Sequence, residues 1–242
     1  MYDYLIIGSG LFGSVFAHEA KKRGRACLVI DKRPAAGGNI RCERVDGINV
    51  HLYGPHIFRT NDEDIWNYVN SLTPFYQYTH QVMAFASGRM YNLPFNMNTF
   101  YQVYGTMSPN EALVRLAESG ANGVGRPNGS LQDHAISLVG RDLYRIFIKG
   151  YTEKQWGRPC SELPASILSR IPLRFTYDNN YFNDRFQGLP VGGFNSLTNA
   201  LLEGIEVKLG VDFFSDPTYF RSLAKKIVYT GAIDEYFSYR FG

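Results

Sequence analysis

The 242-residue sequence predicts an α/β fold, and three observations support this prediction. An apolar run over residues 4–7 leads into the glycine-rich turn 8–13 and then into a helical pattern. A second apolar run over residues 26–30 ends at Asp31, and a third strand over residues 226–231 closes on Thr-Gly. The long stretch between them combines helical periodicity with a hairpin, which predicts an inserted helical cluster and a small antiparallel sheet.

The turn over residues 8–13, GSGLFG, matches the G-x-G-x-x-G pattern of Rossmann-like dinucleotide-binding domains. Gly8 permits the tight turn, Gly10 lets the backbone approach a pyrophosphate, and Gly13 lets the helix pack on the strand. Asp31 falls where an acidic residue accepts a hydrogen bond from a ribose hydroxyl. A glycine-rich turn in another kind of α/β protein is the alternative, but the two strands, the helix and the acid in register favour dinucleotide binding.

The composition excludes several classes of protein. A net charge of +3 gives no basic field that would attract nucleic acid. Cys27, Cys42 and Cys160 are widely spaced and odd in number, which predicts a reducing compartment with neither a disulfide framework nor a metal site. We expect no membrane span and, because Met1 leads directly into a strand, no signal peptide. The sequence therefore predicts a cytoplasmic protein.

The inserted stretch begins with two helix-start patterns. Thr60 with Glu63, and Ser108 with Glu111, each have the spacing of a capping box. Both patterns are followed by apolar residues at helical spacing, so we expect a helix after each.

Further along the chain, residues 132–149 predict one long helix, and residues 81–94 predict a hairpin that turns at Ser87-Gly88. Residues 171–182 are a candidate strand, and residues 121–130 have the composition of a flexible loop. Residues 188–204 predict a turn followed by a helix.

A second glycine-rich element follows the ribose acid. Arg33, Gly37, Gly38 and Asn39 lie in a segment that resembles the large FAD-binding family of amine oxidases and GTPase dissociation inhibitors. NAD enzymes generally lack this element, so the sequence predicts FAD as the cofactor.

Candidate substrate residues lie in three segments. His56 follows a turn, and Tyr151 and Trp156 lie in GYTEKQWG, which we expect to be a short polar turn. The third segment, residues 169–186, contains three arginines and two tyrosines: Arg170, Arg174, Arg185, Tyr177 and Tyr181. Aromatic faces beside guanidinium groups suit a nucleotide with a diphosphate. The alternatives are that His56 is a structural hydrogen-bonding residue and that the arginines form a solvated face.

Several idiosyncratic strings together resemble the bacterial UDP-galactopyranose mutases. They include YLIIGSGLFGSV, YGPHIF, NLPFNMNTF, AISLVGRDLY, IKGYTEKQWGR, SRIPLRFTYDNNYF, PVGG and DEYFSYRFG, and the resemblance covers residues 1–242. Such proteins continue beyond the YRFG string, so the chain is expected to lack a C-terminal part of the family.

The resemblance implies a flavin-dependent isomerase that interconverts UDP-galactopyranose and UDP-galactofuranose through a flavin N5–sugar adduct with reduced FAD and no net redox change. It also implies a homodimer that serves the biosynthesis of cell-surface polysaccharide. A FAD-dependent oxidoreductase of the amine-oxidase type is the alternative function. A non-enzymatic binder is a third hypothesis, but the intact glycine motif with Asp31 argues against it.

The motifs and the resemblance together assign residues to roles. The expected cofactor-binding residues are Gly8, Gly10, Phe12, Gly13, Asp31, Lys32, Gly38, Asn39, His56 and Ile57. The expected substrate-binding residues are His80, Phe147, Tyr151, Thr152, Trp156, Arg170 and Tyr181. Arg170, on a mobile loop, and His56 are the catalytic candidates, and no metal is expected.

Three positions depart from the family pattern. Pro55 stands where alanine is common, Arg59 where histidine is common, and His80 where asparagine is common. The change at His80 concerns a contact on the uridine side, and the other two lie near the flavin.

We expect five segments in the chain. The FAD-binding domain comprises residues 1–75 and 188–242, the sheet domain comprises residues 76–100 and 166–187, and the helical substrate domain comprises residues 101–165.

Overall fold

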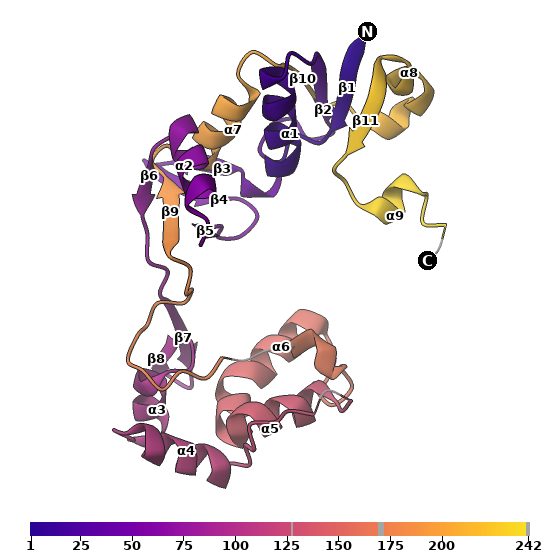
Figure 1. The fold of residues 1–242 in the computed structure, drawn as a ribbon. Helices are drawn as coiled ribbons and strands as arrows, with labels where there is room; N and C mark the ends of the chain where they lie inside the picture. The colour runs from indigo at the N-terminus through magenta and orange to yellow at the C-terminus, as the bar shows by residue number, and fades with distance from the viewer. Residues whose placement is uncertain (127, 169–171, 241–242) are drawn as a thin grey trace. The chain divides into compact units, whose positions relative to one another are not determined.

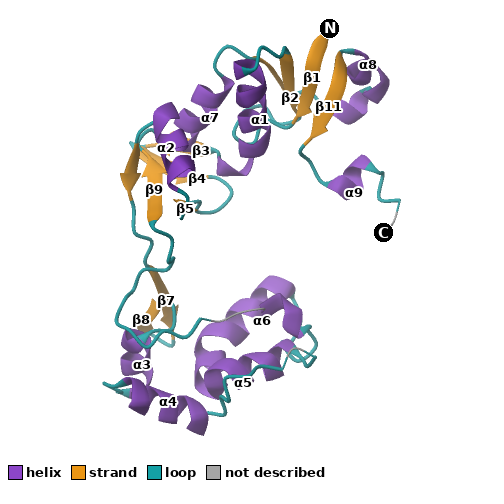
Figure 2. Cartoon of the chain, viewed as in Figure 1, coloured by secondary structure: helices purple, strands orange, loops and turns teal. Residues whose placement is uncertain are grey.

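The computed structural model describes residues 1–126, 128–168 and 172–240, and it divides the chain into two compact units (Figures 1 and 2). The first unit comprises Met1–Tyr78 and Asp184–Gly242, and the second, here called the inserted unit, comprises Thr79–Asn183. The five-segment assignment from the sequence is a finer division, and it stays a prediction.

A parallel four-stranded sheet with the order β10-β2-β1-β11 forms the centre of the first unit (Figure 1). Its strands are β1 (Tyr2–Ile7), β2 (Cys27–Asp31), β10 (Glu206–Leu209) and β11 (Ala224–Tyr229). Successive side chains of a strand point to opposite faces, so Leu5 packs with Phe220 of α8 (Pro217–Ser222), and Ile6 packs with Ala17 of α1 (Leu11–Lys22). Both faces of the sheet are therefore covered, as a parallel sheet requires.

A second, antiparallel sheet with the order β5-β9-β6 lies in the same unit. Its strands are β5 (Phe58–Thr60), β6 (Phe75–Gln77) and β9 (Phe186–Pro190). A separate hairpin of β3 (Cys42–Val45) and β4 (Ile48–His51) packs with α7 (Phe194–Leu202) through a core that includes Cys42, Phe194, Leu197 and Leu201. The sequence analysis did not predict β3, β4, β5 or β6.

Helix α2 (Glu63–Leu72) begins later than its predicted cap. The N-cap is Asp62, whose carboxylate accepts from the backbone N–H groups of Asp64 and Ile65 at 2.9 and 3.1 Å. Thr60 instead accepts from the N–H of Asp62. The predicted Thr60–Glu63 capping box is therefore wrong, because the intervening aspartate is itself a strong N-cap residue.

The inserted unit contains a hairpin and a cluster of helices. Its elements are β7 (Val82–Ala86), β8 (Arg89–Leu93), α3 (Met97–Tyr104), α4 (Pro109–Glu118), α5 (Leu131–Leu143), η2 (Tyr144–Lys149), α6 (Gly150–Trp156) and η3 (Ala165–Leu168). The hairpin turn at Ser87-Gly88 and the Ser108 N-cap of α4 confirm two predictions. The core of this unit is built around Phe100, Leu131, Val139 and Leu143, all fully buried.

The predicted long helix over residues 132–149 is interrupted. Gly140 has a φ of +83° inside α5, and the chain then forms the π-helical turn η2 before α6 begins. The expectation of a short polar turn over residues 150–157 is also wrong, because Gly150–Trp156 is helical and only Gly157, at a φ of +64°, ends it. The local apolar spacing is the same for a straight and a broken helix, so periodicity did not reveal the break.

The candidate strand over residues 171–182 is not confirmed, because its described part contains no strand. Side chains and isolated backbone hydrogen bonds hold this segment in place of a neighbouring strand. The Asn96 amide donates to the carbonyl of Asp178 at 2.8 Å, and the Arg174 guanidinium donates to the carbonyls of Asn180 and Tyr181. The backbone of Thr176 accepts from the N–H of Met97 at 2.9 Å. An alternating sequence can therefore lie as an ordered loop when such donors satisfy its carbonyls.

The described residues contain neither a helix that could span a membrane nor a cluster that could bind a metal ion. None of their helices has both the length and the apolar character needed to cross a bilayer. In the same part of the chain, His, Cys, Asp and Glu side chains do not gather in groups of three or more that could bind a metal ion.

The break at Gly140 makes a testable prediction. A Cβ at Gly140 would lie 2.8 Å from Cβ of Ser119, and the φ of +83° disfavours any L side chain. We expect Gly140→Ala to lower the free energy of unfolding by about 2 kcal/mol, measured by chemical denaturation. The matched control is Gly150→Ala, whose Cβ meets no atom within 4 Å, and which should raise the free energy of unfolding by about 0.5 kcal/mol. Equal effects of the two changes would contradict the prediction.

Candidate functional site

A cavity of about 530 Å³ lies in the first unit, at the carboxyl ends of the parallel strands. Its walls come from the β1–α1 turn, the end of β2, η1 (Gly38–Ile40), the segment after β10, the end of β11 and α9 (Ile233–Tyr236). This is the edge at which open α/β sheets bind their ligands. Of the ten predicted cofactor residues, the structure brings eight to this cavity. They are Gly8, Gly10, Phe12, Gly13, Asp31, Lys32, Gly38 and Asn39.

Three of the glycines are required by the fold itself. A Cβ at Gly13 would lie 2.0 Å from the carbonyl oxygen of Gly8, and a Cβ at Gly38 would lie 2.8 Å from Cα of Gly10. Gly8 has a φ of +110°, and its Cβ would lie 2.0 Å from Oγ1 of Thr230. These glycines let the turn, α1 and η1 approach one another closely.

Gly10 differs from the other three glycines. Its φ of −70° is ordinary for any residue, and an added Cβ would meet Cα of Gly38 only at 3.8 Å, a normal contact. The fold therefore tolerates a side chain at this position. Glycine at Gly10 is explained if a ligand approaches the backbone here at the N-terminus of α1, where a phosphate group is stabilised.

Asp31 connects the walls of the cavity. Its carboxylate is only 8% exposed and accepts from the N–H and hydroxyl of Ser9, at 2.8 and 2.6 Å, and from the N–H of Arg33 at 2.9 Å. A carboxylate has about four acceptor positions, so capacity remains for one ribose hydroxyl. Asp31 thus organises the glycine-rich turn in addition to its predicted role.

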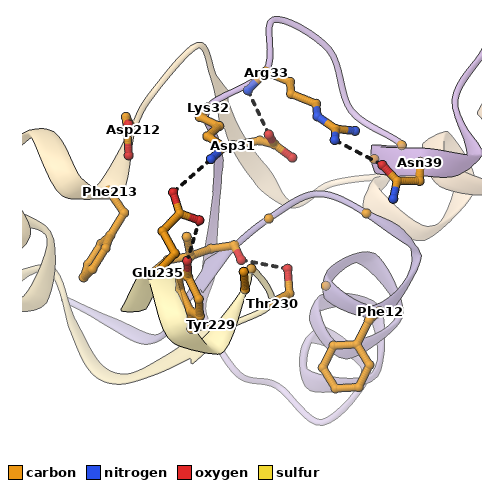
Figure 3. A pocket seen from close by; sticks show the side chains of 18 of the residues that line it. Phe12, Asp31, Lys32, Arg33, Asn39, Asp212, Phe213, Tyr229, Thr230 and Glu235 are labelled. Carbon is orange, nitrogen blue, oxygen red and sulfur yellow. Dashed lines mark hydrogen bonds and ion pairs between the residues drawn. The ribbon is translucent and has the colours of Figure 1, made fainter. Parts of the chain in front are cut away.

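Polar side chains line the cavity on two sides, as Figure 3 shows. Lys32 pairs with Glu235 at 3.1 Å, and the Tyr229 hydroxyl donates to the second oxygen of Glu235 at 3.2 Å. Burial and the Glu235 charge raise the pKa of Tyr229 to about 12, so its hydroxyl remains a hydrogen-bond donor at neutral pH. This network joins the ends of β2 and β11.

On the other side, Arg33 donates to the side-chain oxygen of Asn39 at 3.1 Å (Figure 3). The Arg33 guanidinium also lies over the ring of Tyr53, 4.6 Å from its centroid. Nη1 of Arg33 is buried, and no atom of the described residues forms a hydrogen bond with it. A buried donor of this kind needs an acceptor. The open approach at Gly10 and this guanidinium both fit the diphosphate of a dinucleotide.

His56 and Ile57 are not in the walls of the cavity. They lie between β4 and β5, and the backbone N–H of His56 donates to Nδ1 of His51 at 3.2 Å. Burial, together with the nearby His56, lowers the pKa of His51. The neighbouring departure Arg59 pairs with Asp184 at 2.7 Å, and Pro55 is exposed.

In the inserted unit, η2 and α6 carry four of the predicted substrate residues. Tyr151 is 66% exposed and Trp156 is 51% exposed, whereas Thr152 is buried. Phe147 packs edge-on against Tyr91 at 5.1 Å between ring centroids. Two large aromatic faces on one exposed helix suit the stacking of a planar ligand. A π-helical turn such as η2 is frequent at functional sites.

His80 and Tyr181 form a second aromatic pair in this unit. The backbone N–H of Tyr181 donates to the carbonyl of His80 at 2.8 Å, and the two rings meet edge-on at 5.7 Å. Arg170 lies outside the described residues.

Several cavity residues after position 210 were not predicted from the sequence. Thr230 donates from its hydroxyl to the carbonyl of Ile7 at 2.8 Å, and Phe213 and Glu235 also line the cavity. The Thr-Gly ending of the last strand was a usable signal for Thr230. No local pattern marked Phe213 or Glu235, because their roles depend on the return of the chain to β1.

Comparison with known proteins supports both the predicted Rossmann-like domain and the resemblance to the UDP-galactopyranose mutases. Residues 146–242 match the family model described as UDP-galactopyranose mutase, and residues 6–72 match that of the NAD(P)-binding Rossmann-like domain. A crystal structure of reduced UDP-galactopyranose mutase aligns with a TM-score of 0.62 at 17% identity, over 86% of this chain and 48% of that chain. This structural likeness shows the shared fold, and it confirms the predicted fold class.

Two curated relatives match along almost the whole chain. A probable UDP-galactopyranose mutase from Klebsiella pneumoniae is 39% identical over 99% of this chain and 63% of that protein. A dTDP-fucopyranose mutase from Escherichia coli is 41% identical over 100% of this chain and 66% of that protein. The chain thus spans slightly less than two thirds of the length of these relatives.

The contrast between the glycines makes a prediction about ligand binding. We expect Gly10→Ala to leave the free energy of unfolding within about 0.5 kcal/mol of the unchanged protein while weakening FAD binding at least about tenfold. Gly13→Ala should instead lower stability by about 2 kcal/mol or more, because its Cβ collides with the Gly8 carbonyl. Denaturation curves and the quenching of flavin fluorescence on binding measure the two effects. Unimpaired FAD binding by Gly10→Ala would contradict the inference that a ligand approaches the backbone at Gly10.

Proposed function

Because the comparisons confirm the resemblance to the UDP-galactopyranose mutases, we propose that this protein is a flavin-dependent isomerase that interconverts UDP-galactopyranose and UDP-galactofuranose. The main support is the match of residues 146–242 to that family model together with a dinucleotide cavity in the first unit. The amine-oxidase type of reaction has less support, because the family model and the relatives described above are named as mutases.

FAD is the proposed cofactor, and the residues of the cavity fit its ADP portion. The backbone at Gly8 and Gly10, at the N-terminus of α1, would bind the pyrophosphate, and the unpartnered Nη1 of Arg33 would donate to it. Asp31 would accept from the ribose. Bound in its reduced form, FAD would supply a nucleophilic ring nitrogen for substitution at the anomeric carbon, with no net oxidation of the sugar.

The inserted unit is the proposed binding unit for the sugar nucleotide. Tyr151 and Trp156 offer exposed rings for the base, and Thr152 lies one helical turn before Trp156. Arg170 is proposed to neutralise the diphosphate, which makes it the candidate for releasing and returning UDP. His56 is proposed to contact the flavin.

A second candidate substrate is dTDP-fucopyranose, because the chain is 41% identical to the Escherichia coli protein of that name. The two nucleotide bases differ in a methyl group, and His80 replaces the asparagine that we expect on the uridine side. The proposal also includes a cytoplasmic homodimer that serves cell-surface polysaccharide biosynthesis, which rests on the family resemblance.

The conversion of sugar nucleotides tests the function. The complete protein is incubated with UDP-galactofuranose, with and without dithionite, and the products are separated by chromatography. We expect conversion to UDP-galactopyranose only with reduced flavin. Conversion that is independent of flavin redox state, or no conversion, would reject the mutase. A parallel incubation with dTDP-fucopyranose distinguishes the two substrates.

Tryptophan fluorescence tests the role of Trp156. UDP should quench the emission of Trp156, because stacking of the base on an exposed indole changes its environment. The chain has one other tryptophan, Trp66, which stacks on Phe186 at 5.5 Å in the first unit. Trp156→Phe is therefore a matched control that should abolish the response, and an unchanged spectrum at saturating UDP would argue against this site. The same titration with dTDP ranks the two nucleotides.

A further inference from the structure

The hairpin of β3 and β4 is fixed to the start of α7 by a pair of hydrogen bonds. The Asn195 side chain accepts from the N–H of Cys42 at 3.0 Å and donates to the carbonyl of the same residue at 2.6 Å. Cys42 pairs across the hairpin with His51, whose ring meets Phe194 edge-on at 5.8 Å. His51 is therefore held from two directions, by the strand pairing with Cys42 and by the ring of Phe194.

From this position, His51 holds the following segment. Its Nδ1 accepts the backbone N–H of His56 at 3.2 Å, which requires the ring proton to be on Nε2. Burial lowers the pKa of His51, so the ring is neutral at pH 7 and Nδ1 has a lone pair available. The loop from β4 to His56 is thus closed by one side-chain hydrogen bond.

The imidazole of His56 lacks a hydrogen bond that a buried ring nitrogen needs. Its Nε2 is buried, and no hydrogen-bond partner exists for it among the described residues. Two residues later, Phe58 packs on the same core cluster as Leu11 and Ile40, which both line the dinucleotide cavity. The segment that carries His56 and the wall of the cavity thus rest on one common core.

We propose that His51 is a positioning residue for the flavin site. By accepting the backbone N–H of His56, it holds the His56 ring so that Nε2 can form a hydrogen bond with the bound flavin. This inference rests on the proposed function and on the proposed role of His56, and it adds a residue that neither the motif nor the family resemblance assigns.

Two substitutions separate this role from simple packing. His51→Asn keeps an acceptor oxygen at the same number of bonds from Cβ as Nδ1. His51→Phe keeps a ring against Phe194 but removes the acceptor. Both are prepared in the complete protein, and FAD affinity, the visible absorption spectrum of bound FAD and circular dichroism are measured. We expect His51→Asn to bind FAD within about twofold of the unchanged protein, and His51→Phe to bind about tenfold more weakly with a shifted flavin spectrum.

A double-mutant cycle with His56→Ala tests whether His51→Phe weakens FAD binding through His56. If His51 acts through His56, His51→Phe should cause little further loss in the His56→Ala background. Three results would overturn the inference: both His51 variants matching the unchanged protein, both losing FAD equally, or an undiminished effect of His51→Phe without His56. If the unchanged protein binds no FAD, the proposed function fails as well. If the unchanged protein and His51→Phe bind FAD with equal affinity, only this inference is rejected.

Discussion

The first unit depends on the pairing of its first strand with its last. β1 and β11 lie in parallel register, and the Thr230 hydroxyl at the end of β11 donates to the carbonyl of Ile7, 223 residues away in sequence. The same hydroxyl occupies the space that a Gly8 side chain would need. The tight turn after β1 is therefore shaped by two segments that lie far apart in the sequence, and the cavity forms only when these segments meet.

Two kinds of constraint explain the glycine-rich wall of the cavity. Gly8, Gly13 and Gly38 are required by backbone contacts, whereas Gly10 has room for a side chain. Within the G-x-G-x-x-G motif, Gly8 and Gly13 thus meet a demand of the fold, whereas the proposed ligand accounts for glycine at Gly10; Gly38, outside the motif, also meets a demand of the fold. Asp31 likewise serves the fold, because its carboxylate accepts hydrogen bonds from Ser9 and from the backbone of Arg33, and it retains acceptor capacity for a further donor.

The sequence predicted the parts of the fold whose causes are local. The strand–turn–helix unit at residues 4–20, the hairpin at Ser87-Gly88 and the Ser108 cap follow from short patterns, and all are present. It failed where a distant or competing group decides the conformation. Asp62 replaced Thr60 as a cap, Gly140 divided a regular apolar repeat, and Asn96 bound the backbone of a segment that alternates like a strand. The same distinction holds for the candidate site. The residues of the glycine-rich motif line the cavity as their local pattern predicts, whereas Glu235 and Thr230 reach it only because β11 pairs with β1.

The inserted unit leaves and rejoins the first unit at neighbouring points of one small sheet. The N–H of Tyr78, at the exit, donates to the carbonyl of Gln187, near the return, at 3.2 Å. β6 and β9, which flank these points, are hydrogen-bonded to each other. Because the two crossing segments are already paired, we expect a change in the length or sequence of the insertion to leave the parallel sheet undisturbed. Such an arrangement allows the insertion to be remodelled while the framework that carries it is kept.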